Sequence, residues 1–176
     1  MSLEIDLVDL FGDEVSEDVA VSFGQAVIDT ILDRTASGRS VQGRSFPSYS
    51  DDYADSLQFK AAGKSQGSPD LELTGGMLSS IDITNATPRS ITIAITDPDE
   101  VPKAFNHHTG DTVPARPFFG LSGREIDSLR RDFAPEVEEA ADRMESILGG
   151  LGTAAQTAEA VRRISLLDLL GELDDF

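Results

Sequence analysis

The pattern of apolar and polar residues in the first part of the chain predicts a short strand and then a long helix. Residues 2–10 (SLEIDLVDL) alternate between apolar and polar, which indicates a first strand or an extended arm. After the break at Gly12, Ser16 is a suitable N-cap, and acidic residues follow it where the helix dipole favours anions. We therefore expect a helix over about residues 17–34, ended by Gly38, because apolar and small residues recur at helical spacing at Val19, Phe23, Ala26, Val27, Thr30 and Ile31.

Residues 36–50 (ASGRSVQGRSFPSYS) show no such period and are rich in Ser and Gly. A long loop inside a compact chain is usually functional, and we expect this one to become ordered only between subunits. Directly after the loop, Ser50 is a suitable cap for one short helix that contains Tyr53 and Leu57.

The middle of the chain predicts a small antiparallel sheet. Residues 70–73 (DLEL) alternate as a strand, and a helical turn is expected at residues 77–80. Ile91, Ile93 and Ile95 alternate strictly with polar or small residues, which is the clearest strand pattern in the chain. With the turn residues at 85–88, segments 81–84 and 89–96 form a predicted hairpin.

The last part of the chain is predicted to be largely helical. A short helix is expected within residues 98–106, whereas the prolines at 114 and 117 keep residues 113–120 extended. Ser122 then caps a helix whose apolar face is Ile126, Leu129 and Phe133. We expect Pro135 to kink or restart this helix, the glycines at 149, 150 and 152 to end it, and residues 153–173 to form a last helix.

These elements predict an α+β fold, in which a small antiparallel sheet is packed by an N-terminal helix and a C-terminal helix, with a long inserted loop. We divide the chain into an N-terminal arm or strand (1–14), an α+β domain (15–134) and an acidic helical C-terminal extension (135–176). The length of 176 residues suits one domain with appendages.

Composition removes several classes of protein. The chain has no Cys, which excludes disulfides, thiolate zinc sites and thiol catalysis. No apolar run approaches the roughly 20 residues that a transmembrane helix needs, and the acidic N-terminus does not resemble a secretory signal. We therefore expect no membrane association, and a location in a cytoplasm or in a particle assembled there.

The formal net charge is −18, and the acidic residues are concentrated toward the two ends. Residues 1–35 carry nine acids and one base, and residues 135–176 carry ten acids and three bases. Such a surface repels phosphate and does not grip DNA, although a wall past which DNA slides without sticking has this character. A solvated surface, or adaptation to a salty host, explains the same charge.

Candidate catalytic chemistry is sparse. His107, His108 and Asp111 are the one cluster that resembles metal ligands, but adjacent residues on a helix point about 100° apart and rarely share an ion. Polar residues near a turn are the simpler interpretation. Because no phosphate-binding loop and no pair of nucleophile and base is present, we expect no enzymatic activity, no metal and no cofactor.

The segment VPARPFFGLS (113–122) is the most distinctive in the chain. Two prolines stiffen it, Phe118 and Phe119 provide apolar anchors, and Arg116 lies between the prolines. A pre-organised segment loses little entropy when it docks, either on its own domain, where the two Phe would close the core, or on another chain.

This segment is one of three that resemble a known family. FPSYSDDY (46–53), DLELTGGMLSSI (70–81) and PARPFFGLS (114–122) have the order and rough spacing found in the tailed-phage virion morphogenesis family, whose members are also called tail-completion proteins and include a version in Mu-like phages. The resemblance covers roughly residues 15–133. The chain departs from the family pattern at residues 105–110 (FNHHTG), where a Gln-Phe-Gly phrase is usual, and residues 135–176 extend beyond the usual end.

The resemblance implies a small α+β domain that assembles as a ring at the neck of the virion. Such a ring caps the tail tube, joins it to the DNA-filled head and has no catalytic role. The implied partners are further copies of the chain in a cyclic hexamer, the tail tube protein and the head–tail connector or stopper proteins, while packaged DNA passes without specific binding. The implied location is the neck or tail of the virion, after assembly in the host cytoplasm.

Two alternatives to a tail terminator stay open. One is a head-completion or connector-adaptor protein in the same neck, and the more distant one is an acidic DNA-mimic regulatory protein, which the net charge also suits. For the neck protein, a basic strip of Arg39, Arg44, Lys60 and Lys64 could face the acidic ends of a neighbour. The candidate interface residues are Arg39, Arg44, Phe46, Tyr49, Tyr53, Arg116, Phe118, Phe119, Leu169 and Leu170.

Overall fold

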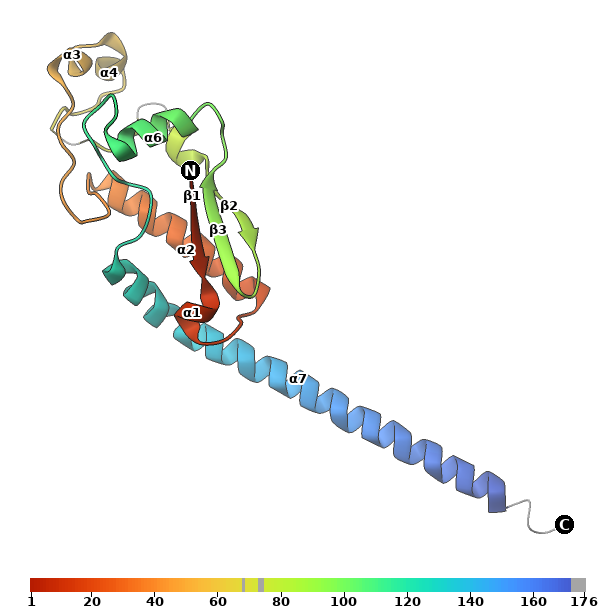
Figure 1. Cartoon of the computed structure of the whole chain (residues 1–176). Coiled ribbons are helices and arrows are strands. Elements are labelled where there is room, and N and C mark those ends of the chain that lie inside the picture. The colour runs from red at the N-terminus through yellow and green to blue at the C-terminus, as the bar shows by residue number, and fades with distance from the viewer. Residues whose placement is uncertain (68, 73–74, 172–176) are drawn as a thin grey trace. The chain divides into compact units, whose positions relative to one another are not determined.

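A computed structural model of the chain describes residues 1–67, 69–72 and 75–171, with side chains described as far as residue 147. The chain divides into two compact units, Met1–Val137 and Glu138–Phe176. The first unit holds a three-stranded sheet and most of the helices (Figure 1). As far as residue 171, the second unit is the continuation of the last helix. The predicted α+β class is confirmed.

The sheet has the order β1-β3-β2, and both pairs of strands are antiparallel. Strands β2 (Ile81–Ala86) and β3 (Ser90–Ile95) form the predicted hairpin, with a shift of register between Ile83 and Asn85. Strand β1 (Ser2–Asp6) pairs along the other side of β3. Of residues 2–10, expected as a strand or an extended arm, only Ser2–Asp6 is thus an edge strand of the sheet. Residues 7–10 instead belong to helix α1 (Leu7–Phe11), because the carboxylate of Asp6 accepts hydrogen bonds from the N–H groups of Val8 and Asp9 and caps this helix.

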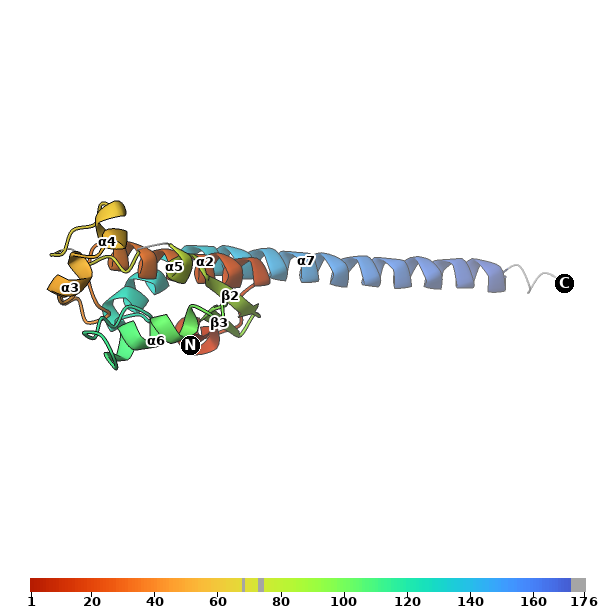
Figure 2. The same cartoon turned by 90° about the horizontal axis from the view of Figure 1, so that it is seen from above.

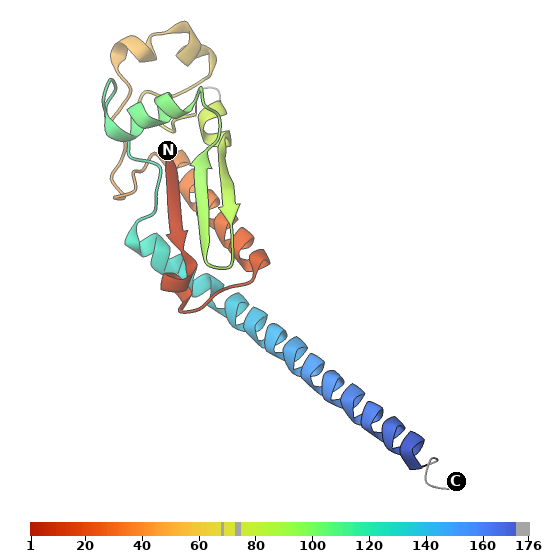
Figure 3. The ribbon, with the colours of Figure 1, turned by 45° about the vertical axis from the view of Figure 1, so that its right-hand side comes forward.

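Helix α2 (Glu17–Ala36) covers one face of the sheet (Figure 3). Its cap is the predicted one, because the hydroxyl oxygen of Ser16 accepts a hydrogen bond from the Val19 N–H at 3.3 Å. The alternating isoleucines of β3 are buried, and so are the residues of the α2 stripe that face the sheet. Gly24 permits the close approach of helix and sheet: a Cβ atom at this position would lie 2.7 Å from Cδ1 of Ile83.

The remaining helices are short apart from the last one. They are α1 (Leu7–Phe11), α3 (Asp51–Ala54), α4 (Leu57–Ala61), α5 (Gly76–Ser79), α6 (Val101–Thr109) and α7 (Gly123–Gly171). Figure 2 shows α3 and α4 side by side at one end of the first unit. The single short helix expected after Ser50 is thus two helices, since Ser56 caps a second one by accepting a hydrogen bond from the Phe59 N–H.

Three expectations about local structure are wrong. Residues 70–73 are expected from the sequence to form a strand, but residues 70–72 lie outside any strand. Leu71 has a φ of 59°, and its N–H donates to the hydroxyl of Tyr49 instead of to a neighbouring strand. Leu73 lies outside the described residues. Helix α7 continues through Pro135, so of the expected kink or restart the restart is wrong. The helix also does not end at the glycines near residue 150. A proline removes one backbone hydrogen bond and a glycine weakens helix propensity, and neither compels a helix to end.

The loop at residues 36–50 is also ordered within the single chain. The backbone N–H of Ser40 donates to the carbonyl of Arg44 at 2.8 Å, and the N–H of Phe46 donates to the carbonyl of Gly38 at 2.7 Å. Gly38 and Gly43 supply the positive φ angles that this tight turn requires. The expectation that the loop becomes ordered only between subunits is therefore wrong, because local hydrogen bonds and the buried ring of Phe46 are sufficient.

Candidate functional site

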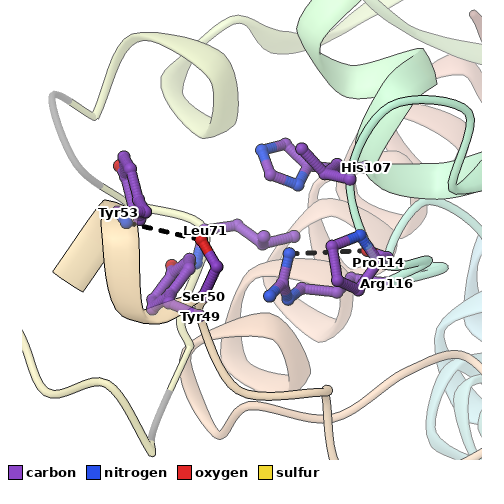
Figure 4. Close-up of a pocket in the computed structure, with 8 residues that line it drawn as sticks. Tyr49, Ser50, Tyr53, Leu71, His107, Pro114 and Arg116 are labelled. Atoms are coloured by element: carbon purple, nitrogen blue, oxygen red, sulfur yellow. Dashed lines mark hydrogen bonds between the residues drawn. The ribbon is translucent and has the colours of Figure 1, made fainter.

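One pocket of the first unit lies where three distant segments of the chain meet. Its volume is about 250 Å³, and its lining comes from residues 49–53, from Leu71, from His107 of α6 and from residues 113–116 (Figure 4). The three segments on which the family resemblance rests each contribute to this lining, although they are far apart in the sequence. Of the candidate residues, Tyr49, Tyr53 and Arg116 are brought together here.

Arg116 holds the walls of the pocket together. Only 2% of its surface is exposed. Its Nε donates to the carbonyl of Pro47 at 3.0 Å, and its Nη2 donates to the carbonyl of Ser48 at 2.9 Å. A longer bond of 3.4 Å joins Nη1 to the carbonyl of Pro114. The guanidinium thus ties residues 47–48 to the proline-stiffened segment, which presents Arg116 in an extended backbone.

The guanidinium of Arg116 also lies over an aromatic ring. Its Cζ is 4.9 Å from the centroid of the Tyr49 ring, a distance at which a cation is attracted to the face of the ring. Tyr49 in turn belongs to a cluster with Tyr53 and Phe59, in which the ring centroids are 5.2 to 5.3 Å apart. This cluster packs α3 and α4 against the pocket.

The charge of Arg116 has no carboxylate partner among the described residues. Burial lowers the pKa of Arg116, but an arginine stays protonated in proteins. Burial, and secondarily the charge of Arg116, lower the pKa of His107, so its imidazole is neutral near pH 7. The Nδ1 atom of His107 is buried and has no hydrogen-bond partner in the described part of the chain. The pocket therefore combines one fixed positive charge, a neutral imidazole and aromatic walls, and its chemistry suits a carboxylate on an apolar stem.

A second polar contact fixes the other end of the same segment. Nη1 of Arg34 in α2 lies 2.8 Å from each carboxylate oxygen of Glu125, and Nη2 of Arg34 donates to the carbonyls of Phe118 and Gly120. The backbone N–H and the hydroxyl of Ser122 donate to the same carboxylate at 2.7 Å. Burial alone would raise the pKa of Glu125, but the hydrogen bonds from Ser122 and Arg34 lower it.

Sequence reasoning did not assign a role to Arg34, Glu125, Phe59 or Leu71. The spacing of Ser122 and Glu125 is that of a capping box, and this signal could have identified Glu125. The partnership of Arg34 with a carboxylate 91 residues away has no local signal. The same is true of Leu71, whose place in the pocket depends on its bond to Tyr49.

The other candidate residues lie apart from the pocket. Phe46, Phe118 and Phe119 are buried in the first unit and leave little surface for a partner. Arg39 and Arg44 are exposed on the turn of the 36–50 loop, which an isolated bridge between Arg39 and Ser45 closes. Leu169 and Leu170 fall in the part of α7 whose side chains lie outside the described residues.

Comparisons of the chain with models of protein families, with curated protein sequences and with solved structures found no match. Within the described ranges, no group of three or more His, Cys, Asp or Glu side chains could hold a metal ion. No helix in that part of the chain is both long enough and apolar enough to cross a membrane.

Proposed function

We propose that this chain is a structural protein of the neck of a tailed-phage virion, where it completes the tail and joins it to the head as a cyclic ring around the DNA channel. The observation that carries the proposal is the meeting of the three family-like segments at Arg116. Tyr49 and Tyr53, Leu71, and Pro114 with Arg116 come from the three segments in turn, and they line one pocket. We take the convergence of the three segments in one pocket as support for the resemblance.

The distribution of charge supports a protein that assembles with copies of itself. A cyclic ring uses a heterologous interface, in which two different patches of the surface are complementary. Arg39 and Arg44 are exposed cationic residues in a chain with 32 acidic and 14 basic residues. Acidic groups of a neighbouring copy are therefore the natural partners of these arginines.

The acidic excess also suits a wall of the DNA channel. A surface with a net charge of −18 does not release counterions from duplex DNA as a binding protein does, so packaged DNA passes without adhering. No catalytic step is part of the proposal, in which the hydroxyl of Ser50 has the structural role of accepting the hydrogen bond of the Tyr53 N–H.

The proposal is tested with tail tubes assembled from the tube protein of the phage that encodes this chain. We expect the purified chain to bind one end of each tube in electron micrographs and to stop tube elongation. The variant Arg44→Glu removes an exposed cation of the proposed interface and should reduce capping, whereas Arg130→Glu, an exposed change of the same charge in α7, is the matched control.

Capping that is equal for wild type and both variants would contradict the role of Arg44 but not the function. No binding to tube ends would contradict the role of tail terminator. Antibody labelling of intact virions at the head side of the neck would then indicate a connector-adaptor protein, and absence of the chain from virions would overturn the proposed function.

A further inference from the structure

The second unit, Glu138–Phe176, is a single helix as far as residue 171, and it carries apolar side chains that face solvent. Met144 is 55% exposed and Ile147 is 63% exposed, and the whole stretch 141–147 is exposed. Most helices in proteins owe their stability to the packing of an apolar face, and glycine is among the least favourable residues in a helix interior. A helix that contains Gly149, Gly150 and Gly152 therefore needs a partner for its apolar face.

The sequence of this helix follows a strict heptad. Apolar residues recur with alternating spacings of three and four over residues 137–161, namely Val137, Ala140, Met144, Ile147, Leu151, Ala154, Ala158 and Val161. A repeat of 3.5 residues differs from the 3.6-residue turn of a straight helix, and it is the signature of helices that supercoil around one another. If Val137 is position a, all of the a and d positions in this range are apolar.

The charged residues occupy the complementary positions. The acids at 138, 139, 142, 145 and 159 fall at positions b, c, f, b and b, which face away from the seam of a coiled coil. The three glycines at 149, 150 and 152 fall at positions f, g and b, so none lies on the seam. Copies of this strongly acidic helix can thus approach one another along the seam without placing carboxylates against carboxylates.

We propose that residues 137–161 of α7 form a parallel coiled coil with the same segment of other copies of this chain. The occupant of the apolar face is a second copy because the heptad requires a partner helix with the same repeat, and the helix itself provides it. The e positions Ala141, Leu148 and Ala155 are also apolar, which widens the seam and favours more than two helices. In the parallel arrangement each a and d residue meets its own counterpart in a neighbouring copy, so the identical heptads align without a shift of register.

Single cysteines test the register directly, because the chain contains no cysteine of its own. In the full chain, Ile147→Cys places a thiol at a d position, and Ser146→Cys places one at the neighbouring c position, which is also exposed. In a parallel coiled coil, thiols at equivalent d positions are within reach of a disulfide. Under mild oxidation we expect most of the Ile147→Cys chain, and little of the Ser146→Cys chain, to form a covalent dimer. Equal cross-linking of the two variants, or none in either, would overturn the proposal.

The same pair of positions tests the effect on assembly. We expect Ile147→Asp to lower the mass of the oligomer in light scattering behind gel filtration and Ser146→Asp to keep the wild-type mass. Both side chains are exposed, and slow hydrogen exchange of the β3 backbone N–H groups checks that the first unit stays folded. A wild-type mass for Ile147→Asp would refute the coiled coil and leave the ring proposal standing. A monomeric wild-type chain would also refute the coiled coil and leave tube capping to decide the function.

Discussion

Replacement of Arg116 by alanine tests the interactions that hold the pocket together. The substitution removes two short hydrogen bonds to the carbonyls of Pro47 and Ser48, a longer one to Pro114, and the stacking on the Tyr49 ring. Residues 46–53 would then lose these links to the proline-stiffened segment. The sheet and α2 should keep their structure, because the hydrogen bonds of the Arg116 side chain go to carbonyls of other segments.

The size of the effect follows from the chemistry of these interactions. Hydrogen bonds of a charged donor contribute about 1.5–3 kcal/mol each, and a partly desolvated cation over an aromatic ring contributes about 1 kcal/mol. Desolvation of the buried guanidinium offsets several kcal/mol of this sum. Water can enter the pocket and satisfy the freed carbonyls of Pro47 and Ser48. We therefore expect Arg116→Ala to lower the free energy of unfolding by about 3 kcal/mol, which corresponds to a fall in Tm of about 6–12 °C for a chain of this size.

Urea denaturation followed by circular dichroism measures the total loss in the free energy of unfolding. Hydrogen exchange shows which residues are destabilised. The backbone N–H groups of residues 46–53 and of Leu71 should exchange faster in the variant, and those of β3 should not. Arg116→Lys, which keeps the charge but not the planar fork, should lie between wild type and alanine. Arg89→Ala is the matched control, because Arg89 makes an exposed ion pair with Glu14 and should cost no more than about 0.5 kcal/mol. A destabilisation below about 1 kcal/mol for Arg116→Ala, or one equal to that of Arg89→Ala, would refute the reasoning.

Three further predictions concern other parts of the first unit. Glu125→Gln should lower the free energy of unfolding by about 2 kcal/mol, since it breaks a largely buried ion pair with Arg34. Because the pKa of Glu125 is lowered in the folded state, the stabilisation by its carboxylate is present above the unfolded pKa and is lost as the pH falls through the folded pKa. In urea titrations the variant should therefore lose less stability on acidification than wild type. Gly24→Val should lower the free energy of unfolding by about 1–3 kcal/mol in the same assay, because the new side chain would press on Ile83. Gly123→Ala serves as the control, since an added Cβ there meets no atom within 4 Å. Equal effects of the two changes would contradict the close packing of α2 on the sheet. In NMR titrations His107 should protonate at a lower pH than a free histidine, because its imidazole is buried and, secondarily, because Arg116 is charged. The pKa of His107 should rise in Arg116→Gln, which removes the positive charge. A normal pKa in wild type would contradict the burial of the imidazole.

The elements that the sequence predicts well are those with a local signal. Ile91, Ile93 and Ile95 identify β3 through their alternation, and Ser16 with the acidic residues that follow it marks the start of α2. Ser122 marks the start of α7 in the same way. In each case the periodicity and the cap agree with the tertiary packing, so a local pattern is enough.

The errors arise where a distant contact overrides the local pattern. DLEL alternates like a strand, but the Tyr49 hydroxyl takes the hydrogen bond of Leu71 and turns the backbone there. The candidate site also contains contacts that no local sequence pattern reveals. Tyr49, Tyr53 and Arg116 stand out in the sequence because of their segments, whereas Arg34 and Glu125 become partners only through the packing of α2 against the residues that precede α7. Exposure separates Arg39 from Arg116, and no sequence pattern indicates which of the two arginines is buried.

The central claim is that the chain assembles into a closed ring, and electron microscopy of the purified full-length protein tests it most directly. The account predicts particles with rotational symmetry around a central channel, in which every subunit occupies an equivalent position. Particles of one subunit size, or open filaments without closure, at concentrations where the chain also fails to cap tail tubes, would contradict it.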